Sequence, residues 1–216
     1  MKTTTKMALA TTAFALVHSA LASRAAKRQA AQLLGQRRAD AFYRLFFVGQ
    51  SVLGFAGLIA YGARLPRRTL YHVSGPAALL LRAGQAGGLA CLYAAARQPG
   101  VAYLTGMRHL EAWRHGLPMP AGPYAQGPER GPDGRLTVAG PYRWSRHPLN
   151  FCGIPIFWLT PHMTTRRLAF NLVSTAYFML GSLHEEARLA AAYGAPYRRY
   201  QRSDVPFFWP SPTRLI

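Results

Sequence analysis

Acidic side chains are scarce in this sequence. Its 216 residues include 7 Asp and Glu against 26 Lys and Arg, which gives a formal charge of +19, and only 15% of the residues are charged. A soluble domain usually carries about a quarter charged residues of mixed sign, so a conventional solvated surface is excluded. Because half of the residues are hydrophobic, a disordered basic tail is excluded as well.

Cysteine is equally scarce, with Cys91 and Cys152 far apart and each inside an apolar run. Two such residues supply neither a disulfide framework nor a zinc ligand set, so we expect two small buried side chains and no metal site. The glycine-rich phosphate-binding motifs of soluble nucleotide-binding proteins are missing. The one glycine pair with a regular spacing, Gly84 and Gly88, predicts close packing of a helix against a neighbour.

Long apolar stretches dominate what is present. They cover residues 7–22, 41–62, 76–96, 148–163 and 166–183. Several approach the ~20 residues that a helix needs to cross a bilayer. The fourth is short and contains Pro155, so we expect a kinked helix that packs in a hairpin with the fifth. The predicted fold is all-α: a polytopic membrane protein with about five transmembrane helices in one domain over residues 1–216.

The first stretch has two interpretations. Lys2 and Lys6 precede an apolar core that ends in Ala20-Leu21-Ala22, the pattern of a secretory signal with a small-residue cleavage site. The same residues also suit a first transmembrane helix that is retained.

The cations alternate along the chain with these stretches. Of the 26, 17 follow the first, third and fifth stretches, 7 fall on the opposite side and 2 lie inside stretches. By the positive-inside rule this places the N terminus outside and the C terminus in the cytoplasm. A nucleic-acid-binding protein would instead gather its cations on one helix or stripe, so we expect a lipid bilayer and no nucleic acid as partner.

A loop rich in glycine and proline covers residues 116–141. Such a composition excludes a helix or a membrane span, and a loop of this length is usually a lid, a binding loop or a linker. We expect it on the cytoplasmic side, directly before the most informative motif of the chain.

That motif begins at Gly140 and reads GPYRWSRHPLNFCG. Pro148 suits the first position of a helix, which places Arg146 and His147 at its N terminus, where free N–H groups favour an anion. Glu185 and Glu186 stand at the predicted cytoplasmic end of the fifth stretch. They either neutralise neighbouring arginines or, brought by the hairpin to the same surface as Arg146, bind a cationic group of a ligand.

These residues carry a family resemblance. Gly-Pro-Tyr-Arg-x-x-Arg-His-Pro, a helical hairpin and a Glu-Glu motif resemble the integral-membrane methyltransferases typified by isoprenylcysteine carboxyl methyltransferase and the phospholipid N-methyltransferases. The second half of the pattern is spelled by Glu185, Glu186, Leu189, Tyr193, Gly194, Tyr197, Tyr200, Pro206 and Pro210. The N-terminal half is similar to the bacterial NnrU-like branch, which includes methanethiol S-methyltransferases. This resemblance favours a retained first helix and a bacterial inner-membrane location.

The resemblance implies S-adenosylmethionine (SAM) as the methyl donor. Its ammonium and carboxylate suit the Glu185/Glu186 and Arg146/His147 pairs. Its adenosine suits the backbone of Gly140, Pro141 and Tyr142 and the rings of Tyr142 and Tyr197; the remaining predicted cofactor-binding residues are Pro148 and Asn150. For a neutral acceptor, His147 or His18 accepts the proton. His18, an ionisable group in a span, equally suits a simple hydrogen bond to a neighbouring helix.

Two departures from the family pattern bear on the substrate. Asn150 stands where family members have Tyr, with Gly153 one position late, and Phe207 replaces an arginine after Val205-Pro206. We therefore predict methylation of a small or lipophilic acceptor, a thiol. The alternatives are methylation of a prenylcysteine carboxylate or lipid amine, and a non-catalytic membrane accessory protein. The sequence favours no particular oligomeric state.

Overall fold

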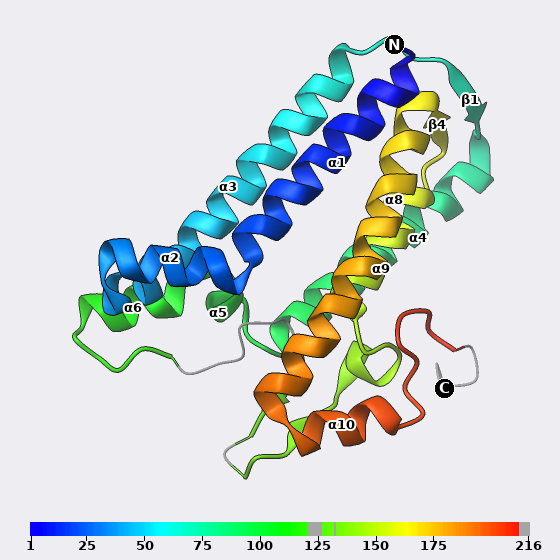
Figure 1. The fold of residues 1–216 in the computed structure, drawn as a ribbon. Helices are drawn as coiled ribbons and strands as arrows, with labels where there is room; N and C mark the ends of the chain where they lie inside the picture. The colour runs from blue at the N-terminus through cyan, green and yellow to red at the C-terminus, as the bar shows by residue number, and fades with distance from the viewer. Residues whose placement is uncertain (121–126, 132, 212–216) are drawn as a thin grey trace. The chain divides into compact units, whose positions relative to one another are not determined.

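The computed structural model describes residues 1–120, 127–131 and 133–211 (Figure 1). The described residues are mostly helical, as the sequence predicts. They form two compact units. The first comprises Met1–Thr69, Val101–Ala121 and Thr164–Ser174, and the second comprises Leu70–Gly100, Gly122–Met163 and Thr175–Ile216.

The first unit is built on long helices. They are α1 (Thr3–Ala22), α2 (Arg24–Leu34), α3 (Gln36–Arg64), α5 (Val101–Thr105), α6 (Met107–Arg114) and the start of α9 (Thr165–Tyr193). α1 lies along α3 (Figure 1), and the ring of Phe14 packs at 6.1 Å from that of Phe55. Arg166 closes the C-terminal end of α3 by donating to the carbonyl oxygens of Gly62, Ala63 and Leu65, because the last carbonyl groups of a helix lack the donors of a following turn.

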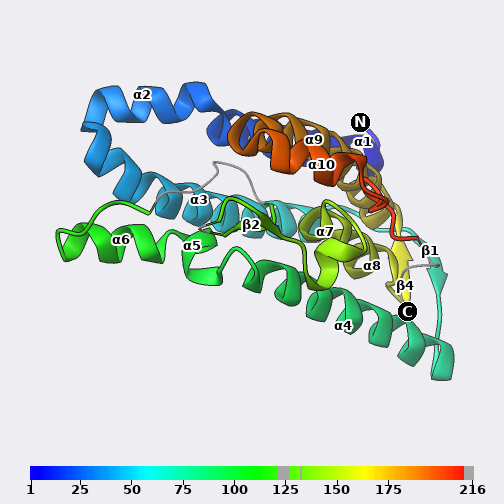
Figure 2. The same ribbon diagram turned by 90° about the horizontal axis from the view of Figure 1, so that it is seen from below.

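The second unit contains shorter elements around α4. They are α4 (Gly75–Arg97), η1 (Gly140–Arg143), α7 (Pro148–Phe151), α8 (Gly153–Trp158), α10 (Ala195–Arg202) and the rest of α9. α4 lies along α7 and α8 (Figure 2). A Cβ at Gly88 would lie 3.0 Å from side-chain atoms of Pro155 and Ile156, and one at Gly84 would collide with Leu159. The predicted close packing at this glycine pair is confirmed.

The prediction of one kinked helix over residues 148–163 is wrong. Helix α7 ends at Phe151, α8 ends at Trp158, and residues after Leu159 are not helical. Pro155 has no N–H to donate to the carbonyl of Phe151, which interrupts the helix, and Pro161 disfavours helical geometry at the residue before it. Ten helical residues at 1.5 Å each reach only about half of the ~30 Å hydrocarbon core.

The other apolar stretches lie in long helices. By length and composition, α3 and α4 are the two described helices that could cross a membrane, and they cover the predicted stretches 41–62 and 76–96. Residues 7–22 lie in α1 and residues 166–183 in α9, which continues to Tyr193. The five membrane spans, the hairpin and the single functional domain stay predictions.

The predicted loop over 116–141 falls partly on residues 121–126 and 132, which lie outside the described residues. Its described part includes β2 (Glu129–Arg130), which pairs antiparallel with β3 (Leu136–Thr137). A second two-stranded sheet joins β1 (Thr69–His72) to β4 (His162–Thr164). The sequence analysis missed these strands, because segments of two to four residues show no alternation of apolar and polar side chains.

Both cysteines are free, and their side chains lie close enough to interact. Cys152, in the break between α7 and α8, is buried as expected, whereas Cys91 on α4 is only partly buried. This contact is one of those that hold α4 against the α7–α8 break.

Candidate functional site

Arg146 and His147 lie directly before α7, on the segment that follows η1. His147 is the N-cap residue and Pro148 begins the helix. The backbone N–H of His147 donates to the hydroxyl of Ser145 at 3.1 Å, and the backbone N–H of Arg146 donates to the carbonyl of Pro206 at 2.9 Å. These bonds fix the backbone from which both side chains project. Because α7 has four residues, its dipole adds little to anion binding.

The carboxylate of Glu186 is the centre of the site. Its Oε1 accepts from Arg146 Nε at 2.8 Å, from the Tyr197 hydroxyl at 3.1 Å, and lies 3.1 Å from His147 Nε2. Its Oε2 accepts from Gln201 Nε2 at 2.6 Å. Four side chains, two from the segment before α7 and two from α10, thus converge on one carboxylate, which is therefore fixed in position.

Glu185 makes longer contacts than Glu186. Its Oε2 lies 3.4 Å from His147 Nδ1 and accepts from Asn150 Nδ2 at 3.3 Å. The same Asn150 amide donates to the Ser182 hydroxyl at 2.9 Å. Glu185 is 7% exposed. Its carboxylate is therefore enclosed by the protein.

The ionisation of the site follows from these contacts. Burial disfavours the charged form of Glu186, but hydrogen bonds from His147, Arg146 and Gln201 outweigh it and lower the pKa of Glu186 to about 2. Burial likewise disfavours protonation of His147, but the two carboxylates outweigh it and raise the pKa of His147. The site therefore favours the ionised form of Glu186, and it favours the protonated form of His147 more than water would.

Arg146 is engaged within the protein. Besides its bond to Glu186, Nη1 donates to the carbonyl oxygens of Gln201 at 3.2 Å and Val205 at 2.9 Å, and Nη2 lies 3.5 Å from Glu186 Oε2. The guanidinium carbon lies 5.8 Å from the centre of the Phe207 ring. The Nη2 group is thus the part of Arg146 with the weakest contact, and it is the part that could turn to a ligand carboxylate.

Tyrosine side chains form the wall behind Glu186. Tyr142 is 1% exposed and Tyr197 is not exposed at all. Tyr200 donates its hydroxyl to the Tyr142 carbonyl at 2.5 Å, whereas the buried Tyr142 hydroxyl has no hydrogen-bond partner among the described residues. Because protein encloses both rings, stacking of adenosine on either face requires neighbouring side chains to move.

Gly140 and Pro141 begin η1 next to the end of α4. Gly140 has φ of +50°, and a Cβ there would lie 3.1 Å from Gln98 Nε2. The Gln98 amide donates to the Ala139 carbonyl. A glycine is needed at this position because the backbone is left-handed and the Gln98 side chain lies against it.

His18 belongs to the first unit, whereas the other predicted site residues belong to the second. Its Nδ1 lies 2.9 Å from the Ser51 hydroxyl, and its ring packs at 4.7 Å from that of Phe47. These contacts join α1 to α3. They match the alternative in which His18 hydrogen-bonds a neighbouring helix.

Gln201 and Ser182 were not predicted from the sequence, and Phe207 was identified only as a departure from the family pattern. Gln201 follows Tyr197 by four residues on α10, so both fall on one face of that helix, and this spacing could have revealed it. Phe207 packs its ring at 5.2 Å from that of His147. Among the described residues, no three His, Cys, Asp or Glu side chains gather as metal ligands.

The described residues fit a small zwitterionic ligand with a cationic end. Glu185 offers a buried carboxylate, Arg146 Nη2 offers a donor, and the unpaired Tyr142 hydroxyl marks a buried polar atom that a ligand or water would satisfy. These features are compatible with the methionyl group of SAM.

Comparison with known proteins points to one class, the methyltransferases. The chain is 41% identical over 73 residues to a methanethiol S-methyltransferase of Mycobacterium tuberculosis, a match that covers 34% of this chain and 30% of that protein. It is 37% identical over 76 residues to the methanethiol S-methyltransferase of Pseudomonas deceptionensis, which covers 35% and 29%. A methanethiol S-methyltransferase 2 of Bradyrhizobium diazoefficiens is 42% identical over 69 residues, covering 32% and 26%.

The predicted resemblance to this branch is confirmed, over about a third of this chain. The matched part spans less than a third of the length of each of these relatives. No family model matches the sequence, and no solved structure matches it.

Proposed function

We propose that this protein transfers a methyl group from SAM to a small or lipophilic thiol at the site around Glu185 and Glu186. The observation that carries the proposal is the convergence of two adjacent carboxylates with Arg146 and His147 in one largely buried cluster. Perturbed ionisable groups of this kind gather at functional sites. The relatives' names supply the type of reaction and the thiol acceptor.

Glu185 is the residue we assign to the SAM ammonium. Glu186 already accepts four donors, so its function is to hold Arg146 and His147 in place. Arg146 Nη2 and the Tyr142 hydroxyl face the remaining polar groups of the methionyl part. SAM itself supplies a methyl group on a sulfonium, which is electrophilic without a metal ion.

The charge state of His147 suits a thiolate acceptor. The raised pKa of His147 favours its protonated form, and the positive charge of that form favours the thiolate over the thiol. A thiolate held ~3–3.5 Å from the methyl group in a site without water needs no further base, because positioning supplies most of the acceleration. His18 stays a candidate base for a neutral acceptor.

Membrane embedding is the second part of the proposal. In the apolar windows of α3 and α4 only 11% and 6% of the residues are buried. Leu53 on α3 and Leu80 on α4 are 74% and 73% exposed. Apolar surface of this extent suits lipid contact, and the cation distribution supports a cytoplasmic C terminus. Reporter fusions at the C terminus test this orientation, and a periplasmic reporter signal would contradict it.

Calorimetry on the full chain in detergent tests the methyltransferase. We expect SAM and S-adenosylhomocysteine to bind, and Glu185→Ala to weaken SAM binding by about tenfold through loss of a charged hydrogen bond. The matched control is Glu111→Ala, which removes an exposed carboxylate from α6. Absence of binding at millimolar ligand would exclude the enzyme and favour the non-catalytic accessory protein.

The acceptor is identified by transfer of labelled methyl groups. The purified protein is incubated with labelled SAM and, separately, with methanethiol, longer alkyl thiols, a prenylcysteine and a lipid extract. We expect label in the thiols. Label in the prenylcysteine or in lipid amines alone would replace the thiol by one of the two alternative acceptors.

A further inference from the structure

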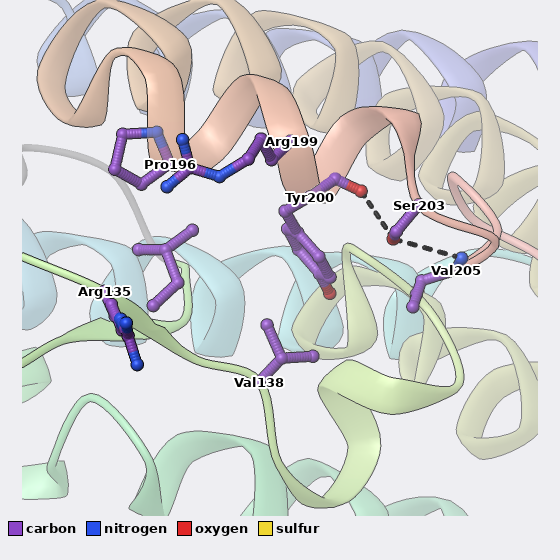
Figure 3. A pocket seen from close by; sticks show the side chains of 8 residues that line it. Arg135, Val138, Pro196, Arg199, Tyr200, Ser203 and Val205 are labelled. Atoms are coloured by element: carbon purple, nitrogen blue, oxygen red, sulfur yellow. Dashed lines mark hydrogen bonds between the residues drawn. The ribbon is translucent and has the colours of Figure 1, made fainter.

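A second ligand-sized space lies beside α10. It is a cavity of about 570 Å³ between that helix and the segment containing β3 (Figure 3). Its lining residues are Arg135, Leu136, Val138, Pro196, Arg199, Tyr200, Ser203 and Val205. Tyr200 separates it from Tyr197 and the Glu186 cluster, because the two rings pack edge to face at 5.8 Å.

The cavity has cationic walls and an apolar floor. Arg135 stands on one side and Arg199 on α10 on the other (Figure 3), and Leu136, Val138 and Val205 add apolar side chains to the lining. Arg135 has one nearby acid, Asp133, at 3.8 Å, and both side chains are highly exposed, so this pair is weak.

The rest of α10 adds to this charge. Its buried face carries Tyr197 and Tyr200, and its exposed face carries Arg198, Arg199 and Arg202. With Arg135, these side chains cluster guanidinium groups in this part of the unit. The combination of clustered arginines and apolar lining suits an anion attached to an apolar body.

The position of the cavity identifies the source of that anion. Gln98, the C-cap residue of α4, donates to the Ala139 carbonyl, next to the lining residue Val138. The cavity therefore lies at the C-terminal end of a helix that is long and apolar enough to cross a membrane. Lipid headgroups lie at the ends of such helices. Trp209, 51% exposed in the same unit, is an interfacial type of residue.

We infer that this cavity binds the phosphate of an anionic phospholipid between Arg135 and Arg199, with the adjoining glycerol and acyl carbons on the apolar floor. The inference rests on the membrane embedding in the proposed function. The cavity does not suit SAM, whose ammonium and sulfonium would face two guanidinium groups. It is thus distinct from the site assigned to the methyl donor.

Binding of a short-chain phosphatidylglycerol to the full chain in detergent tests the inference. The test variant is Arg135→Ala/Arg199→Ala, and the control is Arg67→Ala/Arg108→Ala, which removes the same charge from exposed positions of the first unit. We expect equal binding by wild type and control, and about tenfold weaker binding by the test variant, since charge-assisted hydrogen bonds are lost. Equal binding by all three proteins would overturn the inference.

Further ligands distinguish the sources of the anion. Phosphatidylcholine of the same chain length should bind the wild type and the test variant alike, because its headgroup has no net charge. If inorganic phosphate binds the wild type as tightly as phosphatidylglycerol, the cavity is a site for a free anion. If a glutamate-rich peptide does so, the cavity is a protein-docking site. Either result would overturn the lipid assignment.

SAM binding is measured on the same samples. If SAM binds no variant, the proposed function fails while the phosphatidylglycerol result still stands. If the test variant keeps SAM binding and loses phosphatidylglycerol binding, the two sites are separate, as we infer.

Discussion

Arg146 and Glu186, 40 residues apart in the sequence, form an ion pair with 2.8 Å between Nε and Oε1. Both side chains are largely buried, at 13% and 14% exposed. The same guanidinium donates to the carbonyl oxygens of Gln201 and Val205. One side chain therefore ties the segment before α7 to α9 and to the residues at the end of α10, which makes Arg146 a structural residue of the site as well as a candidate ligand-binding residue.

Replacement of Arg146 should destabilise the protein. Arg146→Ala leaves the Glu186 carboxylate without its charged partner, and breaking such a buried pair costs about 3 kcal/mol. Arg146→Lys should recover only part of this, because a single ammonium cannot reach Glu186 and the two carbonyl groups in the planar arrangement of a guanidinium. Thermal unfolding in detergent measures both variants. Equal unfolding temperatures for Arg146→Lys and wild type would show that charge alone suffices.

A negative charge at position 201 should also destabilise the protein. Gln201 Nε2 donates to Glu186 Oε2 at 2.6 Å, so Gln201→Glu places two carboxylates in contact in a largely buried site. We expect a lower unfolding temperature near neutral pH and partial recovery in acid, where one carboxylate takes up a proton.

Position 36 provides the matched control for this change. Gln36 donates to both oxygens of Asp40 at 2.9 and 3.0 Å on the exposed start of α3. Gln36→Glu makes the same chemical change beside a carboxylate in water, where a like-charge pair costs only about 0.5 kcal/mol. Similar decreases in unfolding temperature for Gln201→Glu and Gln36→Glu would mean that burial of the Glu186 cluster has no energetic consequence.

Much of the fold could be predicted from the pattern of apolar residues. The stretches 41–62 and 76–96 correspond to α3 and α4, and the glycine spacing at Gly84 and Gly88 predicts a close helix contact that the structure contains. The helix in the stretch 148–163 was predicted less well, because apolar composition alone does not account for two local effects. Pro155 and Pro161 remove backbone donors and restrict the preceding residues, and these effects outweigh the apolar composition.

The meeting of Arg146 and His147 with Glu185 and Glu186 could also be predicted, since both motifs are conspicuous in a chain with few acids. Which groups bind Arg146 and which bind Glu186 could not be predicted. This depends on α10 and the segment after it, because the carbonyl oxygens of Gln201 and Val205 accept from Arg146 and the Gln201 side chain donates to Glu186. Backbone carbonyl groups are the same at every position, so no residue pattern indicates which of them will meet a guanidinium.

Gly153 is a position where a single methyl group should matter. A Cβ at this residue would collide with the ring of Phe178 on α9, so Gly153→Ala should cost about 1–3 kcal/mol through overpacking. Gly181, inside α9, has nothing within 4 Å of its Cβ position. Gly181→Ala should therefore stabilise the helix by about 0.5–1 kcal/mol. Unfolding temperatures that shift in opposite directions confirm this contact, whereas a stabilised Gly153→Ala variant would contradict it.

The pH dependence of stability should have two limbs with different origins. The pKa of Glu186 is lowered from 4.5 to about 2 in the folded protein, so its contribution is complete above pH 4.5 and is lost as the pH falls towards 2. The pKa of His147 is raised above 6.5, so its contribution is complete below pH 6.5 and is lost as the pH rises through the folded-state pKa. The cluster therefore contributes most between about pH 4.5 and 6.5. His147→Gln should flatten the alkaline limb of a plot of unfolding temperature against pH and leave a limb in acid, whereas His115→Gln, at an exposed position after α6, should change neither. If the alkaline limb persists unchanged in His147→Gln, a group other than His147 causes it.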